Sequence, residues 1–263
     1  MPLIFTNIST FSPSFSGTID GQGYDWWWYS ISCALPNANH SDTRADMLTI
    51  VQSENILIEG ITFLNSPKYH VNLKDCHNVT VRDFVIEVDV FRQKKMLNDA
   101  GFIDSKGIPT FPLNTDGIDP SASDVHIYNG SITNFDDAVA FKPCRVGNAK
   151  CRSCASGLVE DLKVTYSVGM TIGSVPPNGD INCVKDVIFR NIQMDKPLKG
   201  WATFSFHYSV LVYIDVDVNI RYCMKLECYV DANLFYIADH ITIIRRKICS
   251  FNYFIIFCLY SAF

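Results

Sequence analysis

No glycine and no proline occurs after residue 200, although the first 200 residues hold all 14 glycines and all 11 prolines. Repeated tight turns need such residues, because glycine tolerates left-handed backbone and proline presets a turn angle. The composition therefore predicts one folded domain over residues 1–200, followed by an unassigned tail over residues 201–263. The folded part is long enough for one large hydrophobic core.

The tail has three interpretations. A membrane anchor is the first, because residues 248–263 are mostly apolar and follow Arg245-Arg-Lys247. That stretch is shorter than the ~20 residues of a spanning helix, so we expect no membrane association. A divergent domain is the second interpretation. The third, which we prefer, is an error in the gene structure, such as a translated intron, that leaves an irregular tail on a truncated chain.

An excess of positive charge is also absent. The 22 lysines and arginines face 27 aspartates and glutamates, which gives a net charge of −5. Proteins that bind nucleic acid carry a basic patch or stripe, so this class of partner is excluded. A groove for an acidic ligand would have to depend on a few local basic residues.

A second Cys-X-X-Cys pair is missing, so Cys151-Arg-Ser-Cys154 alone is a weak sign of a metal or redox site. Because Cys144 lies nearby, disulfides that close a loop are the better interpretation, with their connectivity open. We expect no metal and no cofactor. Ten cysteines and four Asn-X-Ser/Thr sequons favour a secreted glycoprotein. No signal-peptide pattern precedes Phe15, and we expect the signal peptide and the N-terminal coil to be missing.

What the chain does contain is a nine-residue repeat. In residues 55–63, apolar side chains occupy the second, fourth, seventh and ninth positions, and the pattern returns at 78, 124, 156 and 186. Eighteen of these twenty positions hold large apolar residues, and the other two are Gly130 and Gly157. Two alternating runs around a Gly, Asn or Asp corner are typical of strands that turn. Steps of 23, 46, 32 and 30 residues favour a parallel β-helix over a β-sandwich, which would not need a fixed period.

Three aspartates are placed one repeat apart. Asp116 precedes the adjacent pair Asp136-Asp137 by about one coil, and a further template step of 32 residues leads from Asp136 to Val168. Because equivalent residues on successive coils lie about 4.8 Å apart, we expect one contiguous, exposed strip. Adjacent like charges raise each other's pKa, which suits acid/base chemistry on a sugar bond. The alternative is that Asp136-Asp137 is only a turn, since aspartate favours turns.

The ordered motifs resemble glycoside hydrolase family 28, the polygalacturonases and related pectin-degrading enzymes. The resemblance covers about residues 15 to 200, and its stretches are Gly17-Thr-Ile-Asp-Gly-Gln-Gly23, Trp26-Trp-Trp28, Asn114-Thr-Asp-Gly117, Asp136-Asp137 and Gly169-Met-Thr-Ile-Gly-Ser174. It implies an all-β fold, a right-handed parallel β-helix (a solenoid), and an inverting hydrolysis of α-1,4-linked galacturonan or a close relative.

The resemblance also implies roles. Asp136 would be the general acid, while Asp116 and Asp137 would together activate the attacking water. For substrate binding we expect Asn114, which would shape the subsite at the cleavage point, together with Lys142 and Gly169. For Lys142, a solvated strand lysine is the alternative.

Two departures weaken the resemblance. The family usually has Gly-His-Gly where this chain has Ser167-Val168-Gly169, and the family's later basic motif is absent near Leu198-Lys-Gly200. A catalytically impaired, carbohydrate-binding β-helix is therefore an alternative to a hydrolase. A pectate-lyase-like β-helix would need calcium and an arginine base, which the aspartate arrangement fits poorly. For the hydrolase we favour exo action, with endo action as the alternative.

The partner expected from these motifs is a pectic polysaccharide substrate. We expect no nucleic acid and no membrane partner, a monomeric state, and an extracellular or cell-wall location.

Overall fold

The computed structural model describes the chain in separate stretches. They are residues 3–6, 16–27, 43–92, 112–145, 154–175, 182–198, 202–206, 216–220, 233–237 and 240–244.

Strands dominate the described residues. They are β1 (Leu3–Thr6), β2 (Gly17–Asp20), β3 (Leu48–Val51), β4 (Glu54–Glu59), β5 (Ile61–Leu64), β6 (Val71–Glu87), β7 (Ile118–Asn134), β8 (Asp137–Phe141), β9 (Cys144–Arg145), β10 (Ala155–Tyr166), β11 (Gly169–Val175), β12 (Asn182–Asp195), β13 (Ala202–Phe206), β14 (Val216–Ile220), β15 (Asn233–Ile237) and β16 (His240–Ile244). Residues 24–27 and 90–92 are helical.

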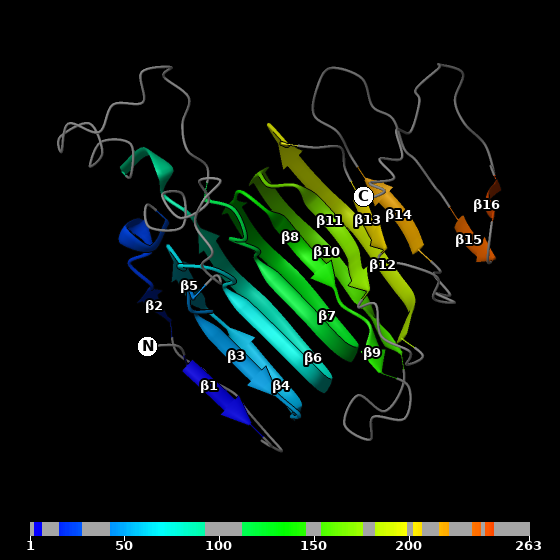
Figure 1. The fold of residues 1–263 in the computed structure, drawn as a ribbon, viewed down its shortest axis with the longest axis horizontal. Helices are drawn as coiled ribbons and strands as arrows, with labels where there is room; N and C mark the ends of the chain where they lie inside the picture. Colours follow the sequence, from blue (N-terminus) through cyan, green and yellow to red (C-terminus); the bar gives the residue numbers. More distant parts are fainter. Residues whose placement is uncertain are drawn as a thin grey trace.

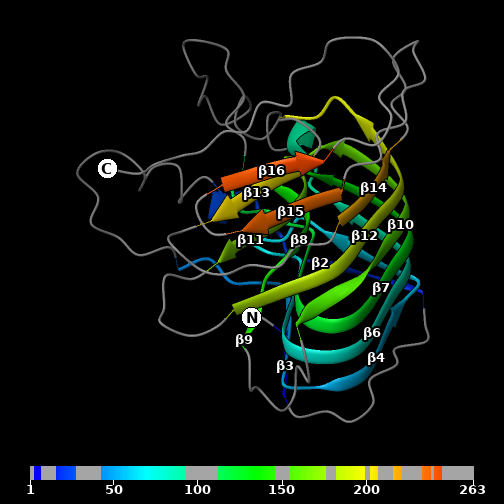
Figure 2. The same ribbon diagram turned by 90° about the vertical axis from the view of Figure 1, so that its right-hand side faces the viewer.

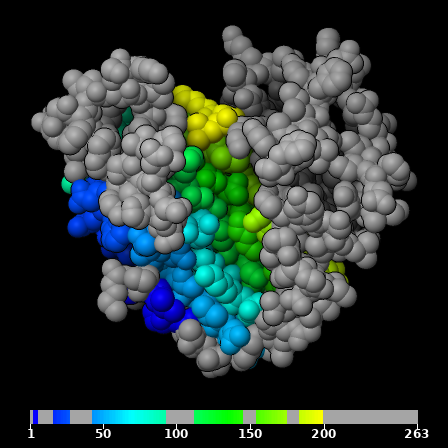
Figure 3. Space-filling view, viewed as in Figure 1, coloured from blue at the N-terminus to red at the C-terminus, as the bar shows by residue number. Residues whose placement is uncertain are grey.

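The strands stack as the rungs of a solenoid. Their main pairing order is β1-β3-β6-β7-β10-β12-β14, and all neighbours on this path are parallel. Figure 1 shows these rungs side by side in chain order, and Figure 2 shows β6 and β7 curving around the molecule. Figure 3 shows the described rungs following one another across one face. Parallel crossovers are right-handed in nearly all proteins. The fold is a right-handed parallel β-helix, which confirms the predicted fold class.

The nine-residue repeat sets the register between rungs. Partners in neighbouring strands occupy equivalent template positions, as in the second-position series Ile56, Val79, Val125, Gly157 and Val187. All eighteen large apolar residues at the four template positions are buried. Their burial drives the coiling, because each rung alone would expose its apolar face to water.

The corners of the coil coincide with the sixth template position. Its five occupants all have a left-handed backbone, with φ between 51° and 69°: Gly60, Asp83, Asn129, Asp161 and Asn191. Glycine, asparagine and aspartate tolerate this conformation better than other residues. The side-chain amides of Asn129 and Asn191 also donate hydrogen bonds to Asp83 and Asp161, respectively. The turn residues of the repeat therefore bend each strand at the same place.

One glycine of the coil makes room for a ring of the core. A Cβ on Gly130 would lie 2.4 Å from Cε1 of Phe84, its partner in the neighbouring rung. Phe84 is 2% exposed, so its ring has no free space to move into. The missing side chain at position 130 therefore compensates for the large one at position 84.

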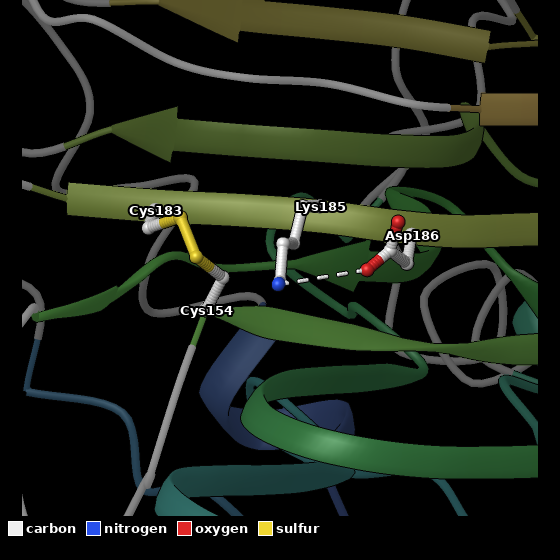
Figure 4. Close-up of a disulfide and its surroundings, with 4 residues drawn as sticks. All are labelled: Cys154, Cys183, Lys185 and Asp186. Carbon is white, nitrogen blue, oxygen red and sulfur yellow. Dashed lines mark ion pairs between the residues drawn. A yellow bond between two sulfur atoms is a disulfide. The ribbon is translucent and has the colours of Figure 1, made fainter.

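A disulfide links two rungs at the edge of the coil. Cys154 bonds to Cys183, 29 residues later, as Figure 4 shows beside the exposed ion pair of Lys185 and Asp186. Cys144 is also disulfide-bonded. The preference for disulfides over a metal site is confirmed for Cys144 and Cys154, whereas Cys151 lies outside the described residues. Cys76 is free and buried.

Parallel pairing continues beyond residue 200. β13 pairs with β11 and β14 pairs with β12, whereas β15 and β16 form an antiparallel pair of their own. The division into a domain over residues 1–200 and a tail over 201–263 stays a prediction. None of the helical segments that the structure describes has the length and hydrophobicity to cross a bilayer.

Candidate active site

The stacking of rungs brings the three predicted aspartates together. Asp116 lies just before β7, Asp136 lies in the turn before β8, and Asp137 is the first residue of β8. Carboxylate oxygens of all three lie within 4.8 Å of one another. The predicted proximity of Asp116 to Asp136 is confirmed.

The backbone of Asp116 is held by a buried histidine. The main-chain N–H of His70 and its ring Nδ1–H both donate to the Asp116 carbonyl, each at 2.9 Å. Nε2 of the same ring accepts from the N–H of Ser66 at 3.4 Å, which makes the ring the Nδ1–H tautomer. Burial lowers the pKa of His70 to about 4, so the ring is neutral at physiological pH.

The expected exposure of Asp116 is wrong, because its side chain is only 4% exposed. Asp116 lies just before β7 and directly follows Thr115, which is fully buried and whose hydroxyl makes two hydrogen bonds. The Thr115 hydroxyl donates to the Pro112 carbonyl at 2.9 Å and accepts from the N–H of Phe135 at 3.2 Å. Asp116 thus forms the buried member of the group, whereas Asp136 and Asp137 are each partly exposed.

Asp136 is oriented by backbone donors. Its Oδ2 accepts from the N–H of Asn114 at 2.8 Å, and its Oδ1 accepts from the N–H of Asp137 at 2.9 Å. Its carbonyl accepts from the Val168 N–H and from the Ser167 hydroxyl, both at 2.8 Å. The predicted adjacency of Asp136 and Val168 is therefore confirmed.

Asp137 is oriented by the next rung. Its Oδ1 accepts a hydrogen bond of 2.6 Å from the hydroxyl of Thr171, and its backbone is in register with Gly169. Gly169 has φ 122°, a backbone conformation that residues other than glycine rarely adopt. The glycine at 169 therefore permits the turn that delivers Thr171 to the carboxylate.

Asn114 lies at the edge of the trio. Nη2 of the buried Arg44 donates to its Oδ1 at 3.1 Å, while Nη1 of Arg44 donates to the Leu113 carbonyl at 2.6 Å. The side chain of Asn114 is therefore fixed by an arginine, while its backbone N–H binds Asp136. This arrangement joins the predicted subsite residue to the predicted acid.

A fourth carboxyl and a lysine adjoin the trio. Nζ of Lys142 lies 3.5 Å from Oδ2 of Asp119, which is 2% exposed. Burial raises the pKa of Asp116 well above its ordinary range, and the charges of Asp119, Asp136 and Asp137 raise it further. Burial likewise raises the pKa of Asp119, against the lowering effect of Lys142. Both shifts favour the protonated forms of these two buried carboxyls.

Three contributors to this site were missed from the sequence. Asp119 stands three residues after Asp116 in the same motif, and that spacing was the available signal. His70 carried no signal, because a lone histidine before a strand gives no indication of its partner. Thr171 could have been found from the 34-residue separation that links it to Asp137, close to the template step of 32 used for Val168.

The spacing of the three carboxylates would also suit one metal ion, since their oxygens lie within 4.8 Å of one another. Hydrolysis by acid and base carboxylates needs no such ion. We assign no metal to these residues, and the expectation that the protein uses none stays a prediction.

Comparison with known proteins decides the family. The model of the glycosyl hydrolases family 28 matches residues 2–202 of this chain. The chain belongs to glycosyl hydrolases family 28. This confirms the resemblance seen in the motifs.

Two polygalacturonases of the curated proteins are similar to the chain over part of their own length. A probable polygalacturonase of Arabidopsis thaliana is 25% identical over 82% of this chain and 40% of its own length. An exopolygalacturonase of Cochliobolus carbonum is 27% identical over 70% of this chain and 35% of its own length. The chain thus spans well under half the length of these relatives.

A solved structure shows the same fold. The endo-xylogalacturonan hydrolase of Aspergillus tubingensis superimposes with a TM-score of 0.57 at 23% identity, over 83% of this chain and 52% of that one. At this identity the likeness establishes the β-helix and nothing about the reaction.

Proposed function

We propose that this protein is a glycosidase that hydrolyses α-1,4-galacturonosyl linkages of pectin by an inverting, three-aspartate mechanism. The observation that supports hydrolysis most is the convergence of Asp116, Asp136 and Asp137 on adjacent rungs of a family 28 β-helix, where an oxygen of each lies within 4.8 Å of the others. This separation is shorter than the roughly 6.5–9.5 Å typical of inverting pairs, so the inverting stereochemistry rests on the family resemblance alone. Glycoside hydrolysis needs one carboxyl to protonate the leaving oxygen and another to activate water. A group of three carboxyls that share a proton can supply both.

The roles we assign follow the family resemblance. Asp136, held by two backbone N–H groups, is the proposed general acid, and Asp137, held by Thr171, is the proposed base together with Asp116. Burial and the neighbouring carboxyls raise the pKa of Asp116, which favours its protonated form. Oxygens of the three carboxyls lie within 4.8 Å of one another, so a proton can pass among them when substrate binds.

The substrate would lie along the strip formed by these rungs. Asn114, Lys142 and Gly169 are the proposed binding residues, since Asn114 and Gly169 adjoin Asp136 and Asp137 and Lys142 ends the same rung. Val168 leaves the position of the usual family histidine without a hydrogen-bonding side chain. The relatives named above include an exopolygalacturonase, which fits exo action on polygalacturonate.

We further propose that the protein is a monomeric, secreted glycoprotein that acts in the extracellular space or cell wall, with pectic polysaccharide as its partner. The bonded Cys154 and Cys183 support an oxidising compartment.

The decisive experiment measures release of reducing ends from polygalacturonate. Wild type should release them, and Asp136→Asn should reduce kcat by about 10²–10⁴-fold. Asp186→Asn, a change on the exposed outer surface, is the matched control and should retain full activity. Turnover should also survive a chelator, whereas a lyase would need calcium and yield an unsaturated product that absorbs in the ultraviolet. Binding of polygalacturonate without any turnover by the wild type would refute the proposal and indicate a carbohydrate-binding protein.

A further inference from the structure

A buried ion pair adjoins the trio of aspartates. Lys142 follows β8, and its backbone N–H donates to the carbonyl of Pro120 at 3.0 Å, next to Asp119 in β7. Its Nζ then lies 3.5 Å from Oδ2 of Asp119. The side chains are 28% and 2% exposed, so the lysine connects a fully buried carboxylate with the partly open site. Adjacent rungs fix both ends of this pair.

Two buried carboxylate oxygens near this pair lack donors. Oδ1 of Asp116 and Oδ1 of Asp119 receive no hydrogen bond from the described part of the chain. A buried oxygen of this kind is costly unless a proton or a nearby cation compensates it. The amine of Lys142, 3.5 Å from Oδ2 of Asp119, supplies a compensating charge beside that carboxyl, and the raised pKa of Asp116 favours compensation there by a proton.

Titratable groups face Asp116 from three directions. On β7 this group is Asp119, and around β8 the groups are Asp136, Asp137 and Lys142. Before β6 they are His70 and Tyr69. The charge of Asp46, near β3, also raises the pKa of Tyr69. His70 is neutral and binds the Asp116 carbonyl, so it adds no charge. The charges that shift the pKa of Asp116 are therefore those of three carboxyls, which raise it, and of the Lys142 amine, which lowers it.

We propose that Lys142 and Asp119 are positioning residues that together set how firmly Asp116 holds its proton. This inference rests on the proposed function and deepens it, because Asp116 is proposed to share the acid/base chemistry with Asp136 and Asp137. Lys142 favours the ionised form of Asp116, and Asp119 favours the protonated form. Burial would lower the pKa of Lys142, but the charges of Asp119, Asp116 and Asp137 outweigh it and raise that pKa, so the amine stays charged.

The same lysine was predicted to bind substrate, and the two roles give different results. A lysine that only binds an anionic sugar raises KM when removed and leaves the ionisation of Asp116 unchanged. A lysine that counterbalances Asp119 moves the ionisation of Asp116 even without substrate. The measurement must therefore observe Asp116 directly as well as the reaction.

The test compares Lys142→Met, Asp119→Asn and the double variant with wild type. Each protein is labelled with 13C at the aspartate Cγ and titrated by NMR, and the Asp116 resonance is assigned by its loss in Asp116→Asn. Lys142→Met should raise the titration midpoint of Asp116 by about one pH unit or more, and Asp119→Asn should lower it by a similar amount. The double variant should lie between them. In hydrolysis assays the acidic limb of the kcat/KM profile should move in the same directions.

Two further variants separate this effect from a general loss of structure. Lys142→Arg keeps the charge and should leave the midpoint near its wild-type value, and Lys185→Met removes a lysine from the exposed ion pair in Figure 4 and should change nothing. Asp119→Asn preserves side-chain size and tests the same claim if Lys142→Met does not fold. An unmoved midpoint in both single variants, or a higher KM alone in Lys142→Met, would overturn the inference. If wild type shows no hydrolysis, the proposed function fails while the titration still decides the inference.

Discussion

The hydroxyl of Thr171 donates a 2.6 Å hydrogen bond to Oδ1 of Asp137 across two adjacent rungs. Thr171 is 2% exposed, so water cannot easily replace this donor. The contact orients the carboxylate that we propose as the base, and it exists only because β8 and β11 stack in register.

Replacing Thr171 by valine should therefore weaken catalysis. The change keeps the shape of the side chain but removes a hydrogen bond to a charged group, worth about 1.5–3 kcal/mol. If part of this loss appears in the transition state, kcat should fall about 10- to 100-fold with little change in KM. Thr171→Ser retains the hydroxyl and should keep most of the activity. Equal loss in both variants would show that packing, not the hydrogen bond, matters.

His70 should control activity through one of its two ring contacts. His70→Asn keeps a donor near the position of Nδ1 and should retain the hydrogen bond to the Asp116 carbonyl. His70→Gln supplies an acceptor near the position of Nε2, so it should retain only the hydrogen bond from the Ser66 N–H. His70→Leu removes both and should lower the free energy of unfolding by about 1–3 kcal/mol. We expect kcat to be highest in the asparagine variant of the three. Higher activity in the glutamine variant would contradict a positioning role for Nδ1.

The buried carboxyl of Asp116 should make the protein less stable as the pH rises. Its pKa is higher in the folded state than in the unfolded state, so the folded protein binds this proton more tightly. The free energy of unfolding therefore falls from about pH 4, the ordinary value, upward through the raised value. Asp116→Asn should equal wild type near pH 4 and be more stable at pH 7, by about 1.4 kcal/mol for each pH unit between the ordinary pKa and the lower of the raised pKa and pH 7.

Urea denaturation at several pH values measures this difference. His70 acts in the opposite direction, because its pKa of about 4 makes the fold less stable as the pH falls below about 6.5. That effect is common to both proteins and cancels in the comparison. An Asp116→Asn variant that is less stable than wild type at pH 7 would show that the carboxylate is compensated by its surroundings.

Gly130→Ala tests the packing of the coil. The added Cβ would lie 2.4 Å from the Phe84 ring, so the free energy of unfolding should fall by about 1–3 kcal/mol. Phe84→Leu in the same protein frees space, and the double variant should lose less than the sum of the two single changes. Additive losses would mean that the glycine and the ring do not interact. Chemical denaturation of the four proteins gives the comparison.

Much of the fold could be predicted because it depends on local periodicity. The apolar positions of the repeat gave the register between rungs, and the Gly, Asn or Asp at its sixth position gave the corner. The pairing of Cys154 with Cys183 could not be derived, because it depends on where loops of different length end. The parallel pairing of β13 was also missed, since its segment lacks the turn residues on which the prediction relied.

The site divides in the same way. The sequence by itself determined that Asp116, Asp136 and Asp137 meet, because the number of residues per coil fixes which side chains stack. Only the tertiary structure decided that Asp116 is buried, that Lys142 faces Asp119, and that His70 holds the Asp116 backbone. Exposure and ionisation depend on how much water and charge surround each group, and these surroundings come from segments far apart in the chain.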